Sequence, residues 1–106
     1  MKSRIVLTIL SILFFCQTYA DDIKVENADG VIIFYDYYNN GTELIVVKTA
    51  GNQTIVNIPE KVTYMGKTRK VTGIGSYAFY DHEYLTSVTI PNSVTFISNN
   101  AFNYCI

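Results

Sequence analysis

The first half of the chain alternates runs of β-branched and aromatic residues with turn-forming residues, which predicts strands rather than helices. Val31–Tyr38 is one such run, and Asn40-Gly41 follows it closely. Asn-Gly between two strand-like runs is a strong hairpin signal, because both residues tolerate a positive φ. Glu43–Lys48 is the expected return strand, and Gln53–Ile58 the strand after it. We therefore predict a three-stranded antiparallel meander from these three runs.

The second half repeats its hydrophobic positions in a 23-residue register. The register superimposes Val71 on Val94, Thr72 on Thr95, Ile74 on Ile97, Ala78 on Ala101 and Phe79 on Phe102. A fixed period of this length, with apolar positions kept and surface positions free, is typical of a solenoid. In that arrangement Phe79 and Phe102 should stack in register. The chain contains about two such repeats.

Within the repeats we predict short strands joined by single helical turns. The strands are Leu85–Ile90, with Leu85, Val88 and Ile90 pointing inward, and Val94–Ile97. Ser76–Phe79 begins with a residue that favours helix N-termini, so about one α-helical or 3₁₀ turn is expected there. Asn99–Tyr104 is the equivalent turn of the second repeat.

One hairpin interrupts the periodicity before the first full repeat. Ile58-Pro59 and Ile90-Pro91 each end a strand, since proline cannot donate to a β-ladder. The distance between the two pairs exceeds the repeat period by nine positions. A small hairpin accounts for the difference, with Val62–Tyr64 leading out, Met65–Lys67 turning and Thr68–Thr72 returning.

Residues 74–105 carry the pattern I-G-x-x-A-F-x-x-C/H-x-x-L-T-S-V-T-I-P-x-S-V-T-x-I. This pattern resembles the BspA-type leucine-rich repeat of secreted and surface proteins. Residues 58–75 are similar to the segment that leads into the first repeat of such proteins. The cysteine of the family's A-F-x-x-C is His82 in the first repeat and Cys105 in the second. The resemblance implies a leucine-rich-repeat solenoid, export, and adhesion or protein recognition, without catalytic residues or a cofactor.

The first twenty residues have the parts of a secretory signal peptide. Lys2 and Arg4 precede a 12-residue run, Ile5–Cys16, which is largely apolar, and small residues flank the end of the segment at Ala20. A membrane-spanning helix needs about 20 apolar residues, so cleavage after Ala20 is favoured over a retained anchor. We expect a signal peptide at 1–20, an N-terminal β-hairpin cap region at 21–70 and repeats at 71–106. The predicted fold is mostly β with short helical turns, a leucine-rich-repeat solenoid capped by the meander.

Charge and cysteine content narrow the possible partners of residues 21–106. This part has 6 basic and 9 acidic side chains, and its net charge is near −3. Nucleic acids and anionic membranes need clustered lysine and arginine, so neither is expected as a partner. Cys105 is the only cysteine left, which rules out an internal disulfide. It is expected to be a small buried hydrophobe, with an intermolecular disulfide as the alternative.

Gly73-x-Gly75-x-x-Ala78 imitates a dinucleotide-binding fingerprint. The second repeat has Phe96 and Ser98 at the two glycine positions, so the repeat does not require glycine at either position. There is also no βαβ unit of about 30 residues around the motif. We therefore predict no nucleotide site and no cofactor.

His82 is the only histidine, and Asp81 and Glu83 flank it. Adjacent residues do not form a converging catalytic group, and the pattern places no nucleophile nearby. Because His82 occupies the position of Cys105 in the next repeat, we predict a packing residue with a polar edge. The sequence also lacks the spacings of a metal site. We predict that the protein is not an enzyme and has no catalytic or metal-binding residues.

Two further surface features could contribute to recognition. Tyr35, Tyr37 and Tyr38 form a local aromatic cluster that could stack on sugar rings or anchor a protein, although cross-strand packing is the simpler interpretation. Asn40 and Asn52 match the acceptor pattern for N-glycosylation and lie in expected turns.

The leading functional hypothesis is a secreted or cell-surface module for protein recognition or adhesion. Its ligand would be a protein, an extracellular-matrix component or a glycan, and not a nucleic acid, and no stable transmembrane span is expected after signal cleavage. The predicted contact face consists of outward strand positions, namely Ile55, Asn57, Thr86, Ser87 and Thr89. The alternative is a structural role, in which the uncapped C-terminal end of the repeats associates with another copy or another repeat protein.

Overall fold

The computed structural model describes residues 23–103 and 105, and this part of the chain is mostly β with no helix. The predicted signal peptide and the end residues Tyr104 and Ile106 lie outside the described residues. The strands are β2 (Ile23–Glu26), β3 (Ile32–Tyr38), β4 (Glu43–Thr49), β5 (Ile55–Asn57), β6 (Lys61–Tyr64), β7 (Lys67–Ile74), β8 (Ser87–Thr89) and β9 (Phe96–Ile97).

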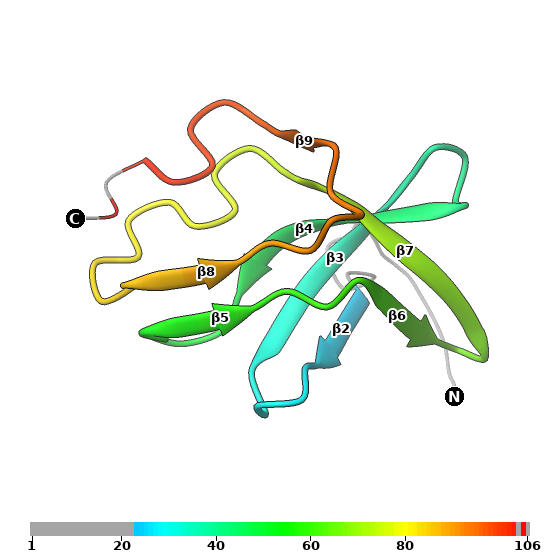
Figure 1. Ribbon diagram of the computed structural model, residues 1–106, viewed down its shortest axis with the longest axis horizontal. Coiled ribbons are helices and arrows are strands. Elements are labelled where there is room, and N and C mark those ends of the chain that lie inside the picture. Colours follow the sequence, from blue (N-terminus) through cyan, green and yellow to red (C-terminus); the bar gives the residue numbers. More distant parts are fainter. Residues whose placement is uncertain (1–22, 104, 106) are drawn as a thin grey trace, which may run out of the picture.

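Six strands form one sheet in the order β2-β3-β4-β7-β6, with β9 also pairing to β7 (Figure 1). The pairs β2–β3, β3–β4 and β6–β7 are antiparallel, whereas β4–β7 and β7–β9 are parallel. β2 and β6 stand at opposite ends of this order, yet they contact each other. The sheet therefore nearly closes on itself.

The expected meander is correct in kind but wrong in its third strand. β5, which covers part of the predicted Gln53–Ile58 strand, leaves the meander and pairs in parallel with β8. The third antiparallel strand is instead β2, which precedes β3. The reason is that β4 has β3 on one edge and β7 on the other, so no edge remains for β5.

Both predicted hairpins are confirmed, and positive backbone angles close them. Asn39, Asn40 and Gly41 have φ values of 53°, 58° and 82° between β3 and β4. Met65 and Gly66, at 51° and 79°, connect β6 to β7. Asparagine and glycine adopt this left-handed region readily, but methionine does so at a cost.

The predicted helical turns are not found, because the described residues of the two segments fold as successive β-turns. In the first, the Ala78 and Tyr80 amides donate to the carbonyls three residues earlier. Tyr77 and its counterpart Asn100 both have φ 62°, in the left-handed region. A residue in that region interrupts a right-handed helix, so the bonding does not continue into one.

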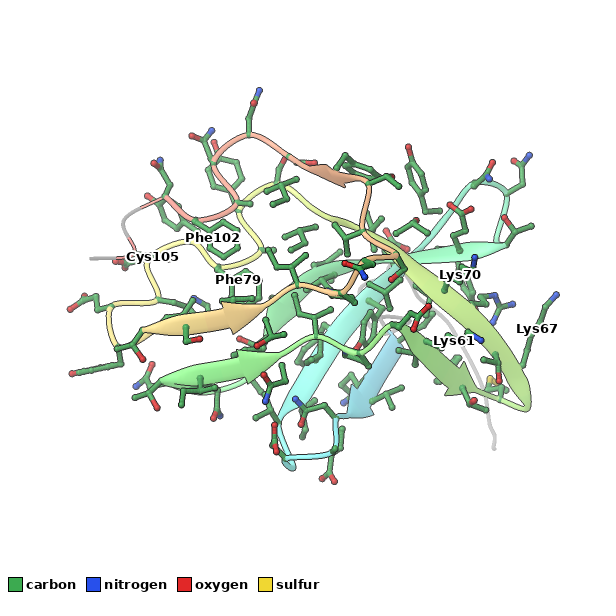
Figure 2. The ribbon with its side chains drawn as sticks, in the orientation of Figure 1. Lys61, Lys67, Lys70, Phe79, Phe102 and Cys105 are labelled. Carbon is green, nitrogen blue, oxygen red and sulfur yellow. The ribbon has the colours of Figure 1, made fainter. Side chains whose placement is uncertain are left out.

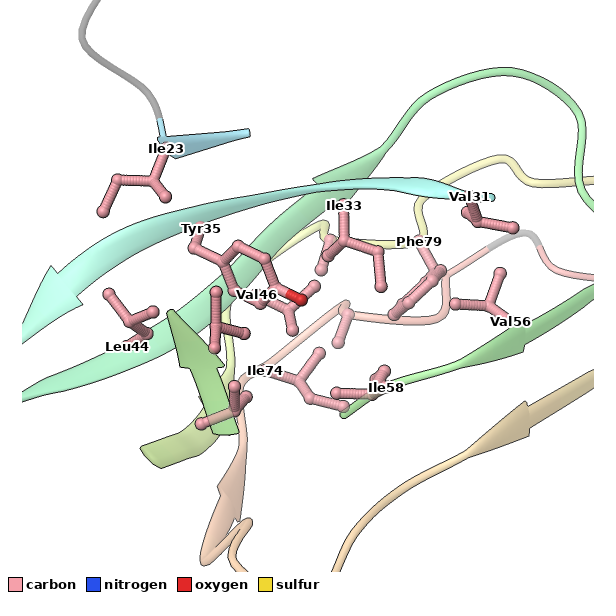
Figure 3. Close-up of a cluster of buried hydrophobic side chains, with 14 residues drawn as sticks. Ile23, Val31, Ile33, Tyr35, Leu44, Val46, Val56, Ile58, Ile74 and Phe79 are labelled. Atoms are coloured by element: carbon pink, nitrogen blue, oxygen red, sulfur yellow. The ribbon is translucent and has the colours of Figure 1, made fainter. Parts of the chain in front are cut away.

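The core lies between the large sheet, the β5–β8 pair and the first of these turn segments (Figure 3). Tyr35 and Phe79 are the largest fully buried side chains. The Phe79 and Phe102 rings lie 5.1 Å apart and 1° from parallel, which confirms the predicted stacking. Burial raises the pKa of Tyr35 well above its usual range.

The repeat is visible as two parallel stacks, and the first of them has the 23-residue register. β7 and β9 align Gly73 with Phe96 and Ile74 with Ile97, one period apart. β5 and β8 form the second stack, with Val56 opposite Val88. The expected solenoid is present only to this extent, because the six-stranded sheet dominates the fold.

Candidate functional site

The predicted contact residues gather mostly on the outer face of the β5–β8 pair. Ile55 is opposite Ser87 and Asn57 is opposite Thr89. Since side chains alternate along a strand, these four share one face, while Val56 points into the core. All four are exposed, and Ile55 is 55% accessible to solvent. We call these four residues the β5–β8 face.

Thr86 directly precedes β8, and by alternation along the chain it does not share the face of Ser87 and Thr89. Its hydroxyl donates to the Thr54 carbonyl oxygen at 2.9 Å, and the Thr86 amide donates to the same atom at 2.7 Å. The residue is exposed, but its hydroxyl is committed to joining the two strands. Thr86 therefore borders the face and supports its edge.

The turn after β2 holds the other end of this face. The Asn57 side-chain amide donates to Asp29 Oδ2 at 2.7 Å, and the Asn57 carbonyl accepts from Asn27 Nδ2 at 2.9 Å. Sequence reasoning missed Asn27 and Asp29. The Asp29-Gly30 dipeptide signals a turn, but no local pattern indicates a partner so distant in the sequence.

The three tyrosines do not form a common platform. Tyr35 is buried, and the exposed Tyr37 lies under the Arg69 guanidinium at 4.9 Å from the ring centre. Tyr38 packs against Phe96 instead, with ring centres 5.2 Å apart. The structure therefore favours separate packing contacts.

His82 has two hydrogen bonds that fit the predicted packing position with a polar edge. Its Nδ1 lies 3.1 Å from the Tyr80 carbonyl oxygen, which accepts only, so Nδ1 is the donor. In the neutral ring Nε2 then accepts from the Thr49 hydroxyl at 3.0 Å. The ring also contacts Phe79 edge-on. Among the described residues, no group of three or more His, Cys, Asp or Glu side chains could hold a metal ion.

The two glycines of the apparent nucleotide motif serve close packing. A Cβ on Gly73 would lie 2.2 Å from the Phe96 ring, so that ring occupies the space that a side chain would need. The Gly75 amide donates to the Val46 carbonyl at 2.8 Å, and a Cβ there would lie 3.1 Å from the same oxygen. Neither glycine leaves its backbone open to a phosphate.

An open groove of about 340 Å³ lies beside β8, at the end of the molecule where Figure 2 shows Phe102 and Cys105. The Cys105 thiol donates to the Phe79 carbonyl at 2.8 Å. Apolar side chains and short polar ones line the groove, namely Leu85, Thr86, Ser87, Val88, Ile90, Phe102 and Cys105. Within the part that the structure describes, no helix is long and apolar enough to cross a membrane.

Comparison with solved structures gives three similar proteins. A leucine-rich repeat protein from Bacteroides ovatus is 32% identical with a TM-score of 0.62, over 66% of this chain and 19% of its own. A leucine rich cell surface protein from Faecalibacterium prausnitzii is 31% identical with a TM-score of 0.62, over 76% and 20%. A leucine-rich repeat protein from Bacteroides capillosus is 28% identical with a TM-score of 0.64, over 77% and 59%.

The chain thus spans only 19% to 59% of the length of these relatives. No curated protein matches it. Residues 48–106 match the family model described as "BspA type Leucine rich repeat region (6 copies)". The matched region covers more than half of the chain and includes both parallel stacks. On this match, the chain belongs to the BspA-type leucine-rich repeat family.

Proposed function

We propose that this chain is a secreted or surface-displayed recognition and adhesion module that binds its partner through the β5–β8 face. The observation that carries the proposal is the exposure of Ile55 on a face whose other three side chains, Asn57, Ser87 and Thr89, are polar. Leucine-rich repeats serve as protein-interaction modules, and family members are generally not enzymes. The partner is a protein, an extracellular-matrix component or a glycan, and Thr86 borders the contact.

The chemistry of the face supports a small interface. A central apolar side chain surrounded by polar groups is the usual arrangement of a protein interface, in which the centre supplies most of the affinity. Ser87 and Thr89 are short, so a partner can approach the strands closely. Only one apolar anchor is available on the four residues, so the affinity should be modest.

The test compares two isoleucines of similar exposure. Ile55 is 55% exposed on the face, and Ile97 is 50% exposed on β9, outside it. Binding of Ile55→Glu and Ile97→Glu is measured against a panel of immobilised extracellular-matrix proteins and glycans. A loss of at least about tenfold for Ile55→Glu alone supports the proposal. Equal losses for the two variants, or a loss for Ile97→Glu only, contradict it.

Export supports the same function and is tested separately. The basic start and short apolar run before Ala20 favour a cleaved signal peptide. The F. prausnitzii relative is itself described as a cell surface protein. The mass of the protein recovered after export should correspond to a chain that begins at Asp21. A chain that stays inside the cell at full length would contradict export.

Assembly through the C-terminal end is the second candidate. The groove beside β8 favours it, because Ile90 is 37% exposed there and β8 pairs with no described strand other than β5. Open strand edges tend to pair with further strands. Sedimentation at two protein concentrations distinguishes the candidates, since a concentration-independent monomer would exclude self-association.

A further inference from the structure

The β6–β7 hairpin concentrates the positive charge of the described chain. Residues 61–70 contain four basic side chains and no acidic one, namely Lys61, Lys67, Arg69 and Lys70. The other described residues have two basic and seven acidic side chains. Figure 2 shows the three lysines at the opposite end of the molecule from Phe102 and Cys105. The positive charge is therefore clustered, although the net charge of residues 21–106 is negative.

The strand register places two of these lysines side by side. Lys61 lies directly opposite Lys70, and Thr63 lies opposite Thr68, so the four share one face of the hairpin. All four are exposed, and the two threonine hydroxyls are 2.6 Å apart. Directly opposed like charges destabilise a sheet. The stability of the hairpin itself therefore gives no reason for this pair.

No described residue forms an ion pair with Lys61, Lys67 or Lys70. Glu43 pairs with Lys70 in the sheet register, but its carboxylate accepts from the Thr72 hydroxyl at 3.0 Å. Arg69 differs, because its Nε donates to the Gly41 carbonyl and its guanidinium covers Tyr37. Three lysine ammonium groups thus remain available to an external anion.

The apex of the same hairpin presents an apolar side chain. Met65 is 86% exposed, more than any other large hydrophobic residue in the described part of the chain. It also has a φ of 51°, a conformation that suits asparagine or glycine better. Neither packing nor turn geometry accounts for a methionine here. Strain and exposure at one residue are features that functional sites often combine.

We propose that the β6–β7 hairpin docks the protein on an anionic lipid bilayer. Met65 enters the boundary between headgroups and acyl chains, while Lys61, Lys67 and Lys70 contact lipid phosphates. Membrane surfaces bind segments that combine apolar insertion with basic flanks. A nucleic acid or an acidic polysaccharide would use the lysines but has no need of an apolar apex. In Figure 1 the hairpin and the β5–β8 pair lie at different ends of the molecule, so the contact face stays accessible on a bound membrane.

The test is co-sedimentation of the exported protein with vesicles. Vesicles of phosphatidylglycerol and phosphatidylcholine in equal parts are compared with vesicles of phosphatidylcholine alone. Each lysine near an anionic surface contributes about fivefold in affinity, so Lys61→Gln with Lys70→Gln should lower binding about 25-fold. Lys24→Gln with Lys48→Gln is the control, because it removes the same charge from β2 and β4, where both ammonium groups lie over Phe34 and outside the hairpin. The control should bind almost as the parent does.

Met65→Asn separates the membrane from other polyanions. Asparagine suits the positive φ, so the melting temperature should not fall, whereas vesicle binding should weaken at least about threefold. Unchanged vesicle binding by Met65→Asn would overturn the proposal and assign the lysines to a soluble polyanion. Equal losses in the hairpin and control lysine variants would overturn it too, since the effect would then follow net charge alone.

Discussion

Equivalent positions in successive coils of the repeat have different environments. Phe79 is fully buried and Phe102 only partly, although the two occupy the same repeat position and stack face to face. Ile74 is 0% exposed, whereas Ile97, one period later, is 50% exposed. The repeat pattern therefore determines the position of a side chain, while the neighbouring coil determines how completely that side chain is buried.

This difference has an energetic consequence. In repeat proteins each unit contacts only its neighbours, so stability is approximately a sum of units and interfaces. Phe79 has the large sheet on one side and Phe102 on the other. Phe102 has Phe79 on one side and the open groove on the other. The inner coil, which contains Phe79, should therefore contribute more of the free energy of unfolding than the outer coil, which contains Phe102. Matched substitutions in the two coils can test this.

The largest expected effect is that of Phe79→Ala. Truncating a buried phenylalanine costs about 3–5 kcal/mol, a large part of the roughly 5–10 kcal/mol expected in total. Phe79→Ala should therefore fail to fold cooperatively in a thermal melt followed by circular dichroism. Phe102→Ala loses one stacked face and less buried area, so it should remain folded with a loss of about 1–3 kcal/mol. Equal losses would contradict the distinction between the coils.

A smaller effect is expected at the isoleucines that directly follow the strands of the second stack. Ile58 is 4% exposed and Ile90 is 37% exposed, and each precedes a proline. Ile58→Ala should lower the free energy of unfolding by about 3 kcal/mol, and Ile90→Ala by about 1 kcal/mol. Urea denaturation measures both. If Ile90→Ala is the more damaging variant, the groove beside it must be filled in solution.

Periodicity and turn chemistry predicted much of this fold. The 23-residue register predicted the stacked phenylalanines, and Asn40-Gly41 predicted the first hairpin. The helical turns failed because Tyr77 adopts a left-handed conformation that its residue type does not suggest. The position of β5 failed because strand pairing depends on which edges are free, and the edge of β4 is taken by β7, which comes later in the chain than β5 itself.

The candidate site was predictable only where alternation along a strand determines it. Ile55 and Asn57 were placed on one outer face from their spacing, and Ser87 and Thr89 likewise. The anchor between Asp29 and Asn57 could not be predicted, because a hydrogen bond between such distant parts of the sequence leaves no local pattern. The opposed lysines were missed for a similar reason. Their pairing depends on a turn at Met65 and Gly66 alone, whereas a three-residue turn was expected.

A further test concerns the packing of a glycine against the next coil. A Cβ at Gly73 would overlap the Phe96 ring, which itself packs on Tyr38. Gly73→Ala should destabilise the protein by about 1–3 kcal/mol through this overlap. In the double variant with Phe96→Ala the overlap disappears, so the two losses should not add. Additive losses in urea denaturation would show that Gly73 is required for its backbone conformation and not for the space that the Phe96 ring occupies.

The smallest expected effect is at Ser93, in the turn between β8 and β9. Its Oγ is buried, and among the described residues it has no hydrogen-bond partner. A buried hydroxyl without a partner costs desolvation free energy that alanine avoids. Ser93→Ala should therefore leave stability unchanged or raise it by up to about 1 kcal/mol, although it shortens a side chain in the outer coil. Ser87→Ala, at an exposed position of β8, is the matched control and should change stability by less than about 0.5 kcal/mol. A clear loss of stability for Ser93→Ala alone would mean that the hydroxyl forms a hydrogen bond to a group that covers the outer coil. The outer coil would then be as well packed in solution as the inner one.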